Sequence, residues 1–241
     1  MNPQAGEILC FNKPYRWTSF DLVSKVRGAL KHRLETKKLK VGHAGTLDPL
    51  ATGVLVVCTG KATKRIDELQ SGVKEYVATL KLGATTPSFD KETEEDAVYP
   101  TDHITRELIE STLPQFIGTV MQVPPAYSAV KINGKRAYNL ARKGEEVELK
   151  AKQLTIDEIE LMQCDIPENV MIRVVCSKGT YIRALARDIG KALNTGAYLT
   201  DLCRTRVGNF KLSECLDIND FDSWLDAQDI KQEKTETNTD K

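Results

Sequence analysis

The stretch G-H-A-G-T-L-D-P-L-A-T-G, residues Gly42–Gly53, is the part of the chain around which we expect the fold to form. Its three glycines and one proline do not suit a regular amphipathic helix or strand. Glycine permits backbone conformations that a side chain forbids, and Pro49 keeps the preceding Asp48 out of the helical region. We therefore expect a tight turn that presents one carboxylate.

A strand is predicted directly after this turn. Val54–Cys58 is apolar and rich in β-branched residues, which is typical of a strand in the core. Such a strand would give the turn the rigid support that a catalytic side chain needs. An Asp-Pro pair alone is also typical of an ordinary turn or a helix N-cap, so a structural role for Asp48 is the alternative.

The composition is that of a soluble globular protein. The 241 residues are 41% hydrophobic and 28% charged, and no apolar run approaches the roughly 18–20 residues of a membrane span. The N-terminus lacks a signal-peptide pattern. Six cysteines without a C-x-x-C pair and three histidines without ligand spacing argue against a disulfide framework or a zinc site. We expect a cytoplasmic, metal-free protein.

The net charge of zero hides a strong asymmetry along the chain. Residues 1–65 hold 12 Lys and Arg against 4 Asp and Glu, and residues 130–211 hold 15 against 10. Residues 66–129 and 212–241 are acidic, with 4 against 11 and 3 against 9. The glycine- and aromatic-rich motifs lie mainly in the basic blocks, which suggests a face that meets phosphate. An ordinary solvated surface is the alternative.

The remaining pattern predicts a mixed α+β domain. Strands are expected where β-branched residues alternate, and helices where apolar residues repeat every three or four positions. The expected strands are Ile8–Phe11, Lys74–Gly83 and Val170–Cys176. A first helix is expected to begin at Thr18 or Ser19, with Phe20, Val23, Val26 and Leu30 on one face, and a second to cover Ile104–Phe116. A third is expected from Ile182 to Leu193, with Ile182, Leu185, Ala186 and Ile189 buried.

Four motifs together resemble the TruB-type pseudouridine synthases, the bacterial enzymes that modify the T-loop uridine at tRNA position 55. They are G-H-A-G-T-L-D-P around Asp48, P-P-x-Y-S-A-x-K-x-x-G-x-R-x-Y over residues 124–138, G-T-Y-I-R over residues 179–183, and L-x-x-L-x-R-T-x-x-G-x-F over residues 199–210. The likeness covers nearly all of residues 7–212. It implies the pseudouridine synthase fold, a mixed, mostly antiparallel twisted sheet flanked by helices.

The resemblance also implies a domain organisation. Residues 1–212 would form the catalytic domain, residues 213–230 a short closing segment with at most one short helix, and residues 231–241 a disordered polar tail. Many bacterial relatives carry a further C-terminal, PUA-like RNA-binding domain. We expect this chain to be a short form without it.

The family assigns roles in the uridine pocket to five residues of this sequence. Asp48 would be the catalytic carboxylate, and Arg183 its ion-pair partner. Tyr76, in a K-x-Y motif, would lie against the target base. Tyr181 would line the pocket and Leu202 would form its wall. A packing role is the alternative for a tyrosine in a strand.

Further residues are expected to contact the RNA around that pocket. His43, beside the catalytic carboxylate, would fill the gap left by the extruded base or stack in the distorted loop; a buried core histidine is the alternative. Lys13, Lys131, Lys135 and Arg136 would contact the RNA backbone, while solvated surface lysines are the alternative.

Three positions depart from the family pattern. Arg16-Trp17 stands where the family usually has a glycine before Thr18-Ser19. The polar, acidic connection from Ala84 to Pro100 resembles a flexible RNA-gripping loop, but its usual D-x-x-G is here Asp90-Lys91-Glu92-Thr93. Cys203 replaces a common arginine, so one phosphate contact is expected to be missing.

The implied reaction breaks a C1′–N1 glycosidic bond, turns the uracil and rejoins it through C5. Nothing is oxidised or added, so no cofactor or metal is expected. An ionised carboxylate suits the role of nucleophile or base, and whether Asp48 adds to the base or promotes elimination at the sugar stays open. The target base must first be extruded from the RNA loop.

The expected partner is the T-arm stem-loop of tRNA, bound by a monomer without a protein partner or a membrane. Two other functions stay open at this point. One is a non-catalytic RNA-binding or RNA-folding module on the same fold. The other is a pseudouridine synthase that acts on a different RNA with the help of guiding partners.

Overall fold

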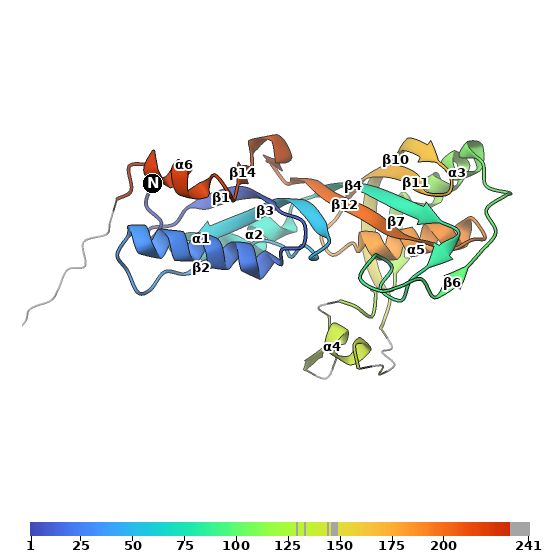
Figure 1. Ribbon diagram of the computed structural model, residues 1–241, viewed down its shortest axis with the longest axis horizontal. Helices are drawn as coiled ribbons and strands as arrows, with labels where there is room; N and C mark the ends of the chain where they lie inside the picture. The colour runs from blue at the N-terminus through green and yellow to red at the C-terminus, as the bar shows by residue number, and fades with distance from the viewer. Residues whose placement is uncertain (129, 133, 144, 146–148, 232–241) are drawn as a thin grey trace, which may run out of the picture. The chain divides into compact units, whose positions relative to one another are not determined.

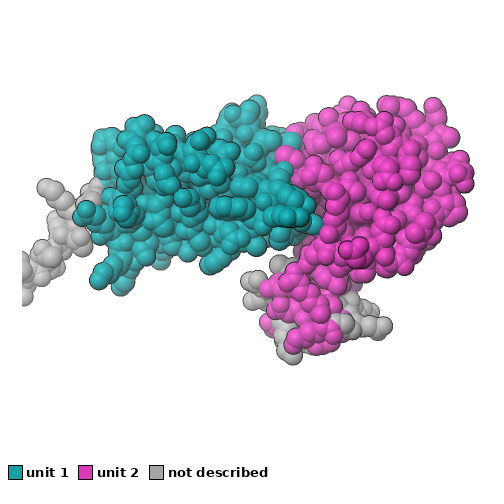
Figure 2. Space-filling model, viewed as in Figure 1, with its two compact units in different colours: residues 1–72, 204–241 teal, residues 73–203 magenta. Residues whose placement is uncertain are grey.

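The computed structural model describes residues 1–128, 130–132, 134–143, 145 and 149–231. The chain forms two compact units (Figure 2). Unit 1 combines Met1–Gly72 with the segment that starts at Arg204, and unit 2 comprises Val73–Cys203. Unit 1 is therefore built from two segments that lie far apart in the sequence. Most of the expected tail, residues 232–241, lies outside the described residues.

Unit 1 holds a small sheet covered by helices (Figure 1). Strand β1 pairs antiparallel with β3 and parallel with β14, and β2 pairs antiparallel with β3. Strand β12 begins in unit 2 and ends in unit 1, where its last residues pair antiparallel with β13. The bounds are β1 Ile8–Lys13, α1 Ser19–Arg33, β2 Val41–His43, β3 Ala51–Thr59, η1 Gly60–Arg65, α2 Ile66–Ser71, β12 Ala197–Val207, β13 Phe210–Lys211, η3 Leu212–Glu214, β14 Leu216–Asp217 and α6 Phe221–Asp226.

Unit 2 is built on four antiparallel strands in the order β4, β11, β10, β7. Two small hairpins, β5–β6 and β8–β9, stand outside this sheet. The bounds are β4 Lys74–Leu82, β5 Ala84–Thr85, β6 Ala97–Val98, α3 Arg106–Thr112, η2 Leu113–Phe116, β7 Gly118–Gln122, β8 Lys131–Ile132, β9 Lys135–Arg136, α4 Ala137–Ala141, β10 Lys152–Asp165, β11 Asn169–Cys176 and α5 Ile182–Ala192. With helices beside mostly antiparallel strands, the α+β class is confirmed.

Helix α1 begins where the sequence predicts it. The Thr18 hydroxyl accepts a hydrogen bond from the Asp21 amide, and the Asp21 carboxylate accepts one from the Thr18 amide, which completes a capping box. The expected buried face is wrong at one position, because Phe20 is 66% exposed. The buried stripe is Ser19, Leu22, Val23, Val26 and Leu30. At 3.6 residues per turn, position 20 lies about 100° from the centre of that stripe.

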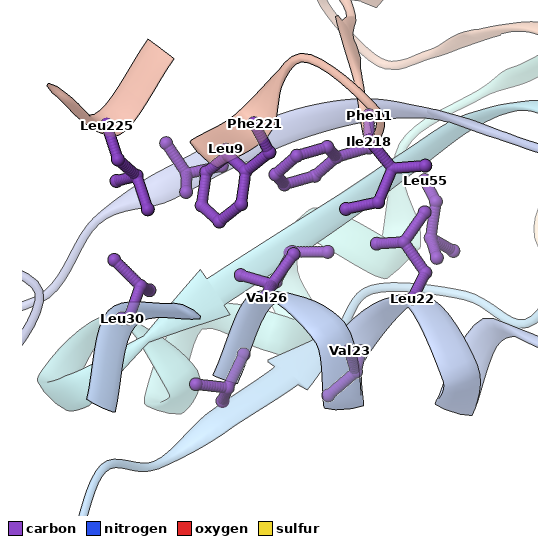
Figure 3. Close-up of a cluster of buried hydrophobic side chains, with 12 residues drawn as sticks. Leu9, Phe11, Leu22, Val23, Val26, Leu30, Leu55, Ile218, Phe221 and Leu225 are labelled. Atoms are coloured by element: carbon purple, nitrogen blue, oxygen red, sulfur yellow. The ribbon is translucent and has the colours of Figure 1, made fainter. Parts of the chain in front are cut away.

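The core of unit 1 joins both segments of the chain. Leu22, Val26 and Leu30 of α1 point toward side chains from β1 and α6 (Figure 3). The rings of Phe11 and Phe221 meet edge to face with their centroids 5.1 Å apart. The segment 213–230 thus does more than close the chain, because its α-helix, α6, supplies part of this core.

The longest strand, β10, is not evident from the sequence. It has 14 residues, but its pairing with β11 shifts register between Ile156 and Glu158 and again between Leu161 and Gln163. Each such irregularity turns the following side chains to the other face of the sheet, so the two-residue alternation is lost. Among residues 1–128, 130–132, 134–143, 145 and 149–231, no helix has the length and apolar character needed to cross a bilayer.

The core of unit 1 generates a first prediction. Replacing the fully buried Phe221 with alanine should lower the free energy of unfolding by about 3–5 kcal/mol, because it removes a large ring and leaves a cavity. Phe20→Ala, which removes the same ring from an exposed position, should change it by less than about 0.5 kcal/mol. Urea unfolding measures both. Equal losses in the two variants would contradict the packing described for α6.

Candidate active site

Asp48 lies half-buried on the loop that joins β2 to β3. The turn expected over Gly42–Gly53 is confirmed, although it is shorter than that stretch. Strand β2 continues to His43, and β3 begins at Ala51, three residues before the predicted Val54. The amide of Ala51 donates to the carbonyl of Asp48 over 3.1 Å, so β3 starts as a direct continuation of the turn.

A buried arginine holds the first half of this loop. The Arg204 side chain donates from Nε to the Val54 carbonyl over 2.8 Å, from Nη2 to the Gly45 carbonyl over 3.0 Å and from Nη1 to the Thr46 carbonyl over 3.3 Å. The residue is 2% exposed. A guanidinium group presents several donors in one rigid plane, so it fixes the position of the loop at Gly45 and Thr46 relative to strand β3 at Val54.

A buried lysine holds the other end of the loop. Lys13 is fully buried, and its Nζ donates to the carbonyls of Pro14, Trp17 and Pro49 over 2.8, 2.6 and 3.5 Å. Burial lowers its pKa to about 8, although the Asp48 carboxylate has the opposite effect. The predicted contact of Lys13 with an RNA backbone is therefore wrong. Its ammonium group has no exposed surface and serves to position the loop.

A serine fixes the middle of the loop. The Ser19 hydroxyl donates to the Leu47 carbonyl over 3.2 Å and accepts from the Leu47 amide over 2.9 Å. Ser19 is the first residue of α1, so the start of this helix is tied to the residue before Asp48. The backbone on both sides of the catalytic candidate is therefore bound by buried side chains.

Close packing also demands a glycine at the end of this stretch. Gly53 has a φ of +103°, and a Cβ atom there would lie 2.2 Å from the carbonyl oxygen of Arg204. A side chain would therefore push the backbone that carries Arg204 away from the loop.

His43 ends β2 and is half-buried beside the loop. Burial lowers the pKa of its imidazole, and the charge of Arg204 lowers it further. The ring is therefore neutral near pH 7, which suits contact with a base better than contact with a phosphate.

Arg16 is a strained residue next to the loop. Its φ of +65° lies in the left-handed region, which costs a residue with a side chain roughly 1–2 kcal/mol. Its amide donates to the Pro49 carbonyl over 2.8 Å. The departure from the usual glycine thus keeps the glycine-like backbone conformation, and the arginine adopts it under strain.

In unit 2, Arg183 lies near the start of α5 and is 4% exposed. Its Nη1 donates to the Ser88 carbonyl over 3.1 Å, and its Nη2 donates to the Tyr127 carbonyl over 2.9 Å. Its Nε lies 3.6 Å from Oδ2 of Asp90, which is also buried. Asp90 was not among the residues predicted for the site, although a signal was present in the D-x-x-G motif of the family.

The position of Tyr181 is fixed through its backbone. The buried Gln122 side chain accepts from the Tyr181 amide over 2.9 Å and donates to its carbonyl over 3.1 Å. Tyr181 is the N-cap residue of α5, so Gln122 ties the end of β7 to the start of this helix.

The other predicted pocket residues lie in strands of unit 2. Tyr76 belongs to β4, where it pairs in register with Val174, and Leu202 belongs to β12. Both are buried. Asp48 belongs to unit 1 and Arg183 to unit 2, so their ion pair stays a prediction. The side chains of Lys131, Lys135 and Arg136 lie outside the described residues, and only their backbone pairing in β8–β9 is described.

No cluster of three or more histidine, cysteine, aspartate or glutamate residues is placed to hold a metal ion in the part of the chain that the structure describes.

Two solved structures share this architecture. The crystal structure of a Cbf5-Nop10-Gar1 complex matches with a TM-score of 0.69 and 30% identity over 92% of this chain. The structure of an H/ACA RNP bound to a substrate RNA containing 2'-deoxyuridine matches with a TM-score of 0.65 and 28% identity over 92% of this chain. The match covers 55% and 54% of those two chains, so this chain spans about half their length. The shared architecture is the pseudouridine synthase fold, as predicted.

Sequence comparison then gives the family. The "TruB family pseudouridylate synthase (N terminal domain)" matches residues 31–182, and the "tRNA pseudouridylate synthase B C-terminal domain" matches residues 183–237. The chain belongs to the TruB family of pseudouridylate synthases. It is 65% identical to the tRNA pseudouridine synthase B of Phocaeicola vulgatus, over 96% of this chain and 98% of the relative. It is 66% identical to that of Bacteroides thetaiotaomicron, over 97% and 99%.

The contacts of Arg204 generate a second prediction. Arg204→Lys keeps the charge but not the planar set of donors, so at least one of the carbonyls of Gly45, Thr46 and Val54 loses its partner. Because a shift of about 1 Å in a catalytic group can reduce the rate about a hundredfold, kcat/KM should fall by about that factor. The Kd for tRNA should change less than about threefold, since Arg204 is buried. Single-turnover kinetics and filter binding measure the two effects.

A matched control is Arg65→Lys, because Arg65 is an exposed arginine paired with Glu68 and contacts no loop carbonyl. It should leave both quantities unchanged. A normal rate in Arg204→Lys, measured on a folded variant, would mean that the arginine does not position Asp48.

Proposed function

We propose that this chain converts the T-loop uridine at position 55 of tRNA to pseudouridine, with Asp48 as the catalytic carboxylate. One observation carries the proposal above all others. In a member of the TruB family, the loop around Asp48 has its carbonyls at Gly45, Thr46, Leu47 and Pro49 bound by buried side chains. A backbone fixed at four points around one half-buried carboxylate is the preorganisation that a catalytic group requires.

The reaction moves one bond and adds no atoms. The C1′–N1 bond breaks, the uracil turns, C5 bonds to C1′, and the C5 proton leaves for N1 by way of solvent. Asp48 acts at the sugar or at the ring, and both routes are compatible with its position. Because the reaction is an isomerisation without oxidation or reduction, we propose that it needs neither cofactor nor metal.

Arg183 is proposed to stabilise the Asp48 carboxylate. Two backbone carbonyls and Asp90 hold the guanidinium group in one orientation inside unit 2. A charge-assisted pair with Asp48 would offset the free energy that a desolvated carboxylate costs. Asp90 then acts as a positioning residue, because it contacts the arginine rather than the substrate.

The uracil is proposed to leave the RNA stack before it reacts. Unstacking costs a few kcal/mol, and an aromatic surface returns about 1–3 kcal/mol per base. Tyr76 is proposed as that surface, with Tyr181 and Leu202 lining the pocket. The neutral His43 occupies the space that the base leaves in the RNA loop.

The RNA backbone is proposed to run along Lys131, Lys135 and Arg136, without Lys13. The enzyme is proposed to act as a cytoplasmic monomer that needs no protein partner. One of the similar solved structures contains Nop10 and Gar1 beside Cbf5, and that composition belongs to that complex. Activity of the purified chain alone on a tRNA transcript would distinguish an enzyme that works by itself from one that needs protein partners.

The role of Asp48 gives a third prediction. Asp48→Asn keeps the size of the side chain and removes its negative charge. Release of tritium from uracil C5 of tRNA should become undetectable, while the Kd for tRNA should rise less than about tenfold, the equivalent of 1.4 kcal/mol. Thr46→Ser, a conservative change at an exposed residue two positions away, is the control. Substantial turnover by Asp48→Asn would remove Asp48 from its catalytic role.

A fourth prediction separates the uracil pocket from the phosphate track, which is the proposed path of the RNA backbone along Lys131, Lys135 and Arg136. Tyr76→Ala should reduce the single-turnover rate more than the affinity, because the ring acts on the extruded base. Lys135→Gln with Arg136→Gln should instead weaken binding, and the slope of log K against log salt should fall by roughly 0.7 for each phosphate that is no longer bound. Binding across a KCl series and single-turnover assays measure both. If both variants altered binding alone, the division into pocket and track would be wrong.

A further inference from the structure

The turn Tyr15–Trp17 contains an arginine in a backbone conformation that suits glycine better. Arg16 takes a left-handed φ of +65° that glycine would adopt without strain. Its side chain is exposed. Among residues that the structure describes, its guanidinium group forms no salt bridge, and it lies over the ring of Tyr15. The hydrogen bonds that hold this turn involve its backbone, from the Arg16 amide to the Pro49 carbonyl and from Lys13 to the Trp17 carbonyl, so a glycine at position 16 would keep them.

The Arg16 side chain is nevertheless preorganised. Its guanidinium carbon lies 5.6 Å from the centroid of the Tyr15 ring, a cation–π geometry that limits the motion of the side chain. Tyr15 is 45% exposed. The carboxylate of Asp21, in the first turn of α1, is bound to the amide and hydroxyl of Thr18. The planar donors of Arg16 therefore stay available for an anion that approaches from outside.

The turn is fixed to the loop that carries Asp48. The Arg16 amide donates to the Pro49 carbonyl over 2.8 Å. The buried ammonium of Lys13 donates to the carbonyls of Trp17 and Pro49 at once. A nucleotide whose uracil reaches Asp48 must bring its own phosphates to the surface around this loop. An arginine on that surface has the geometry and charge to bind one of them.

We propose that the turn Tyr15–Trp17 is an RNA contact, in which Arg16 binds a backbone phosphate next to the target nucleotide and Tyr15 supports its guanidinium group. The inference rests on the proposed function, because it takes RNA as the substrate. Strain at a position that glycine suits better is thus exchanged for affinity toward a ligand, as is common at functional sites.

The proposal predicts that Arg16→Gly raises the stability of the protein and lowers its affinity for RNA. Arg16→Gly removes the strain, so Tm should rise by about 2–4 °C. The same change removes the phosphate contact, so the Kd for a T-arm stem-loop RNA should rise about tenfold, the equivalent of 1.4 kcal/mol. The slope of log K against log KCl should fall by roughly 0.7–0.9. The rate at saturating RNA should stay unchanged.

Two further variants separate charge from strain. Arg16→Lys keeps the positive charge and the strained backbone, so it should keep the wild-type salt slope and Tm. Glu35, with a φ of +49°, is another strained, exposed residue of unit 1. Glu35→Gly should raise Tm in the same way without weakening RNA binding. Differential scanning fluorimetry and fluorescence anisotropy over a KCl series measure these quantities.

The inference is overturned if Arg16→Gly binds the stem-loop with the wild-type Kd and salt slope, or if Arg16→Lys reduces the slope as much as Arg16→Gly does. It is also overturned if Arg16→Gly melts below the wild type. Failure of the proposed function has a different outcome, because the wild-type chain would then release no tritium from uracil C5 at any RNA concentration. If the wild type releases tritium and Arg16→Gly binds RNA as the wild type does, the proposed function stands and only the role of the turn is wrong.

Discussion

The binding of loop carbonyls by two buried cations is the constraint on which unit 1 depends. Lys13 and Arg204 come from β1 and β12, and together they bind five backbone carbonyls, from Pro14, Trp17, Gly45, Thr46 and Val54, as well as that of Pro49 at longer range. A buried charge without partners costs several kcal/mol, so each cation confines the chain to the arrangement in which its carbonyls are present. The position of Asp48 follows from where these carbonyls must lie.

Unit 2 uses the same device with an added carboxylate. Arg183 binds two carbonyls and lies beside Asp90, so its guanidinium group is oriented by the backbone as well as by charge. An arginine fits such a site better than a lysine, because its planar donors meet several acceptors in fixed directions. In both units, cationic residues of a type that is usually exposed, Lys13, Arg204 and Arg183, are buried.

Regular elements and the catalytic loop were predictable, because their signals are local. Alternation marks β4 and β11, the Thr18-Asp21 pair marks the start of α1, and glycine with proline marks the turn at Asp48. The burial of Lys13 was also within reach, since Leu9, Phe11 and Lys13 share the inward face of β1. A lysine, however, is usually exposed to solvent, so the residue type alone argues against burial. One of the carbonyls that accept its hydrogen bonds, that of Pro49, also lies in a distant loop.

The features that were not predictable depend on distant partners. Arg204 and Gly45 are 159 residues apart, and the irregular register of β10 follows from its neighbour β11. The separation of the chain into two units likewise leaves no local mark, because the boundary after Gly72 and the one before Arg204 fall in otherwise ordinary sequence. Motif resemblance supplied the site residues without showing what holds them.

The two-segment construction of unit 1 has a consequence for protein synthesis. A ribosome makes β1, α1 and the Asp48 loop early, but Arg204 and the α6 residues Phe221 and Leu225 come only near the end of the described chain. Unit 2, by contrast, is one continuous stretch. A nascent chain therefore carries the complete sequence of its catalytic loop, with Lys13 and Ser19, long before Arg204 is made. A chain cut short before residue 204 would contain Asp48 without the hydrogen bonds that hold the Gly45 and Thr46 carbonyls.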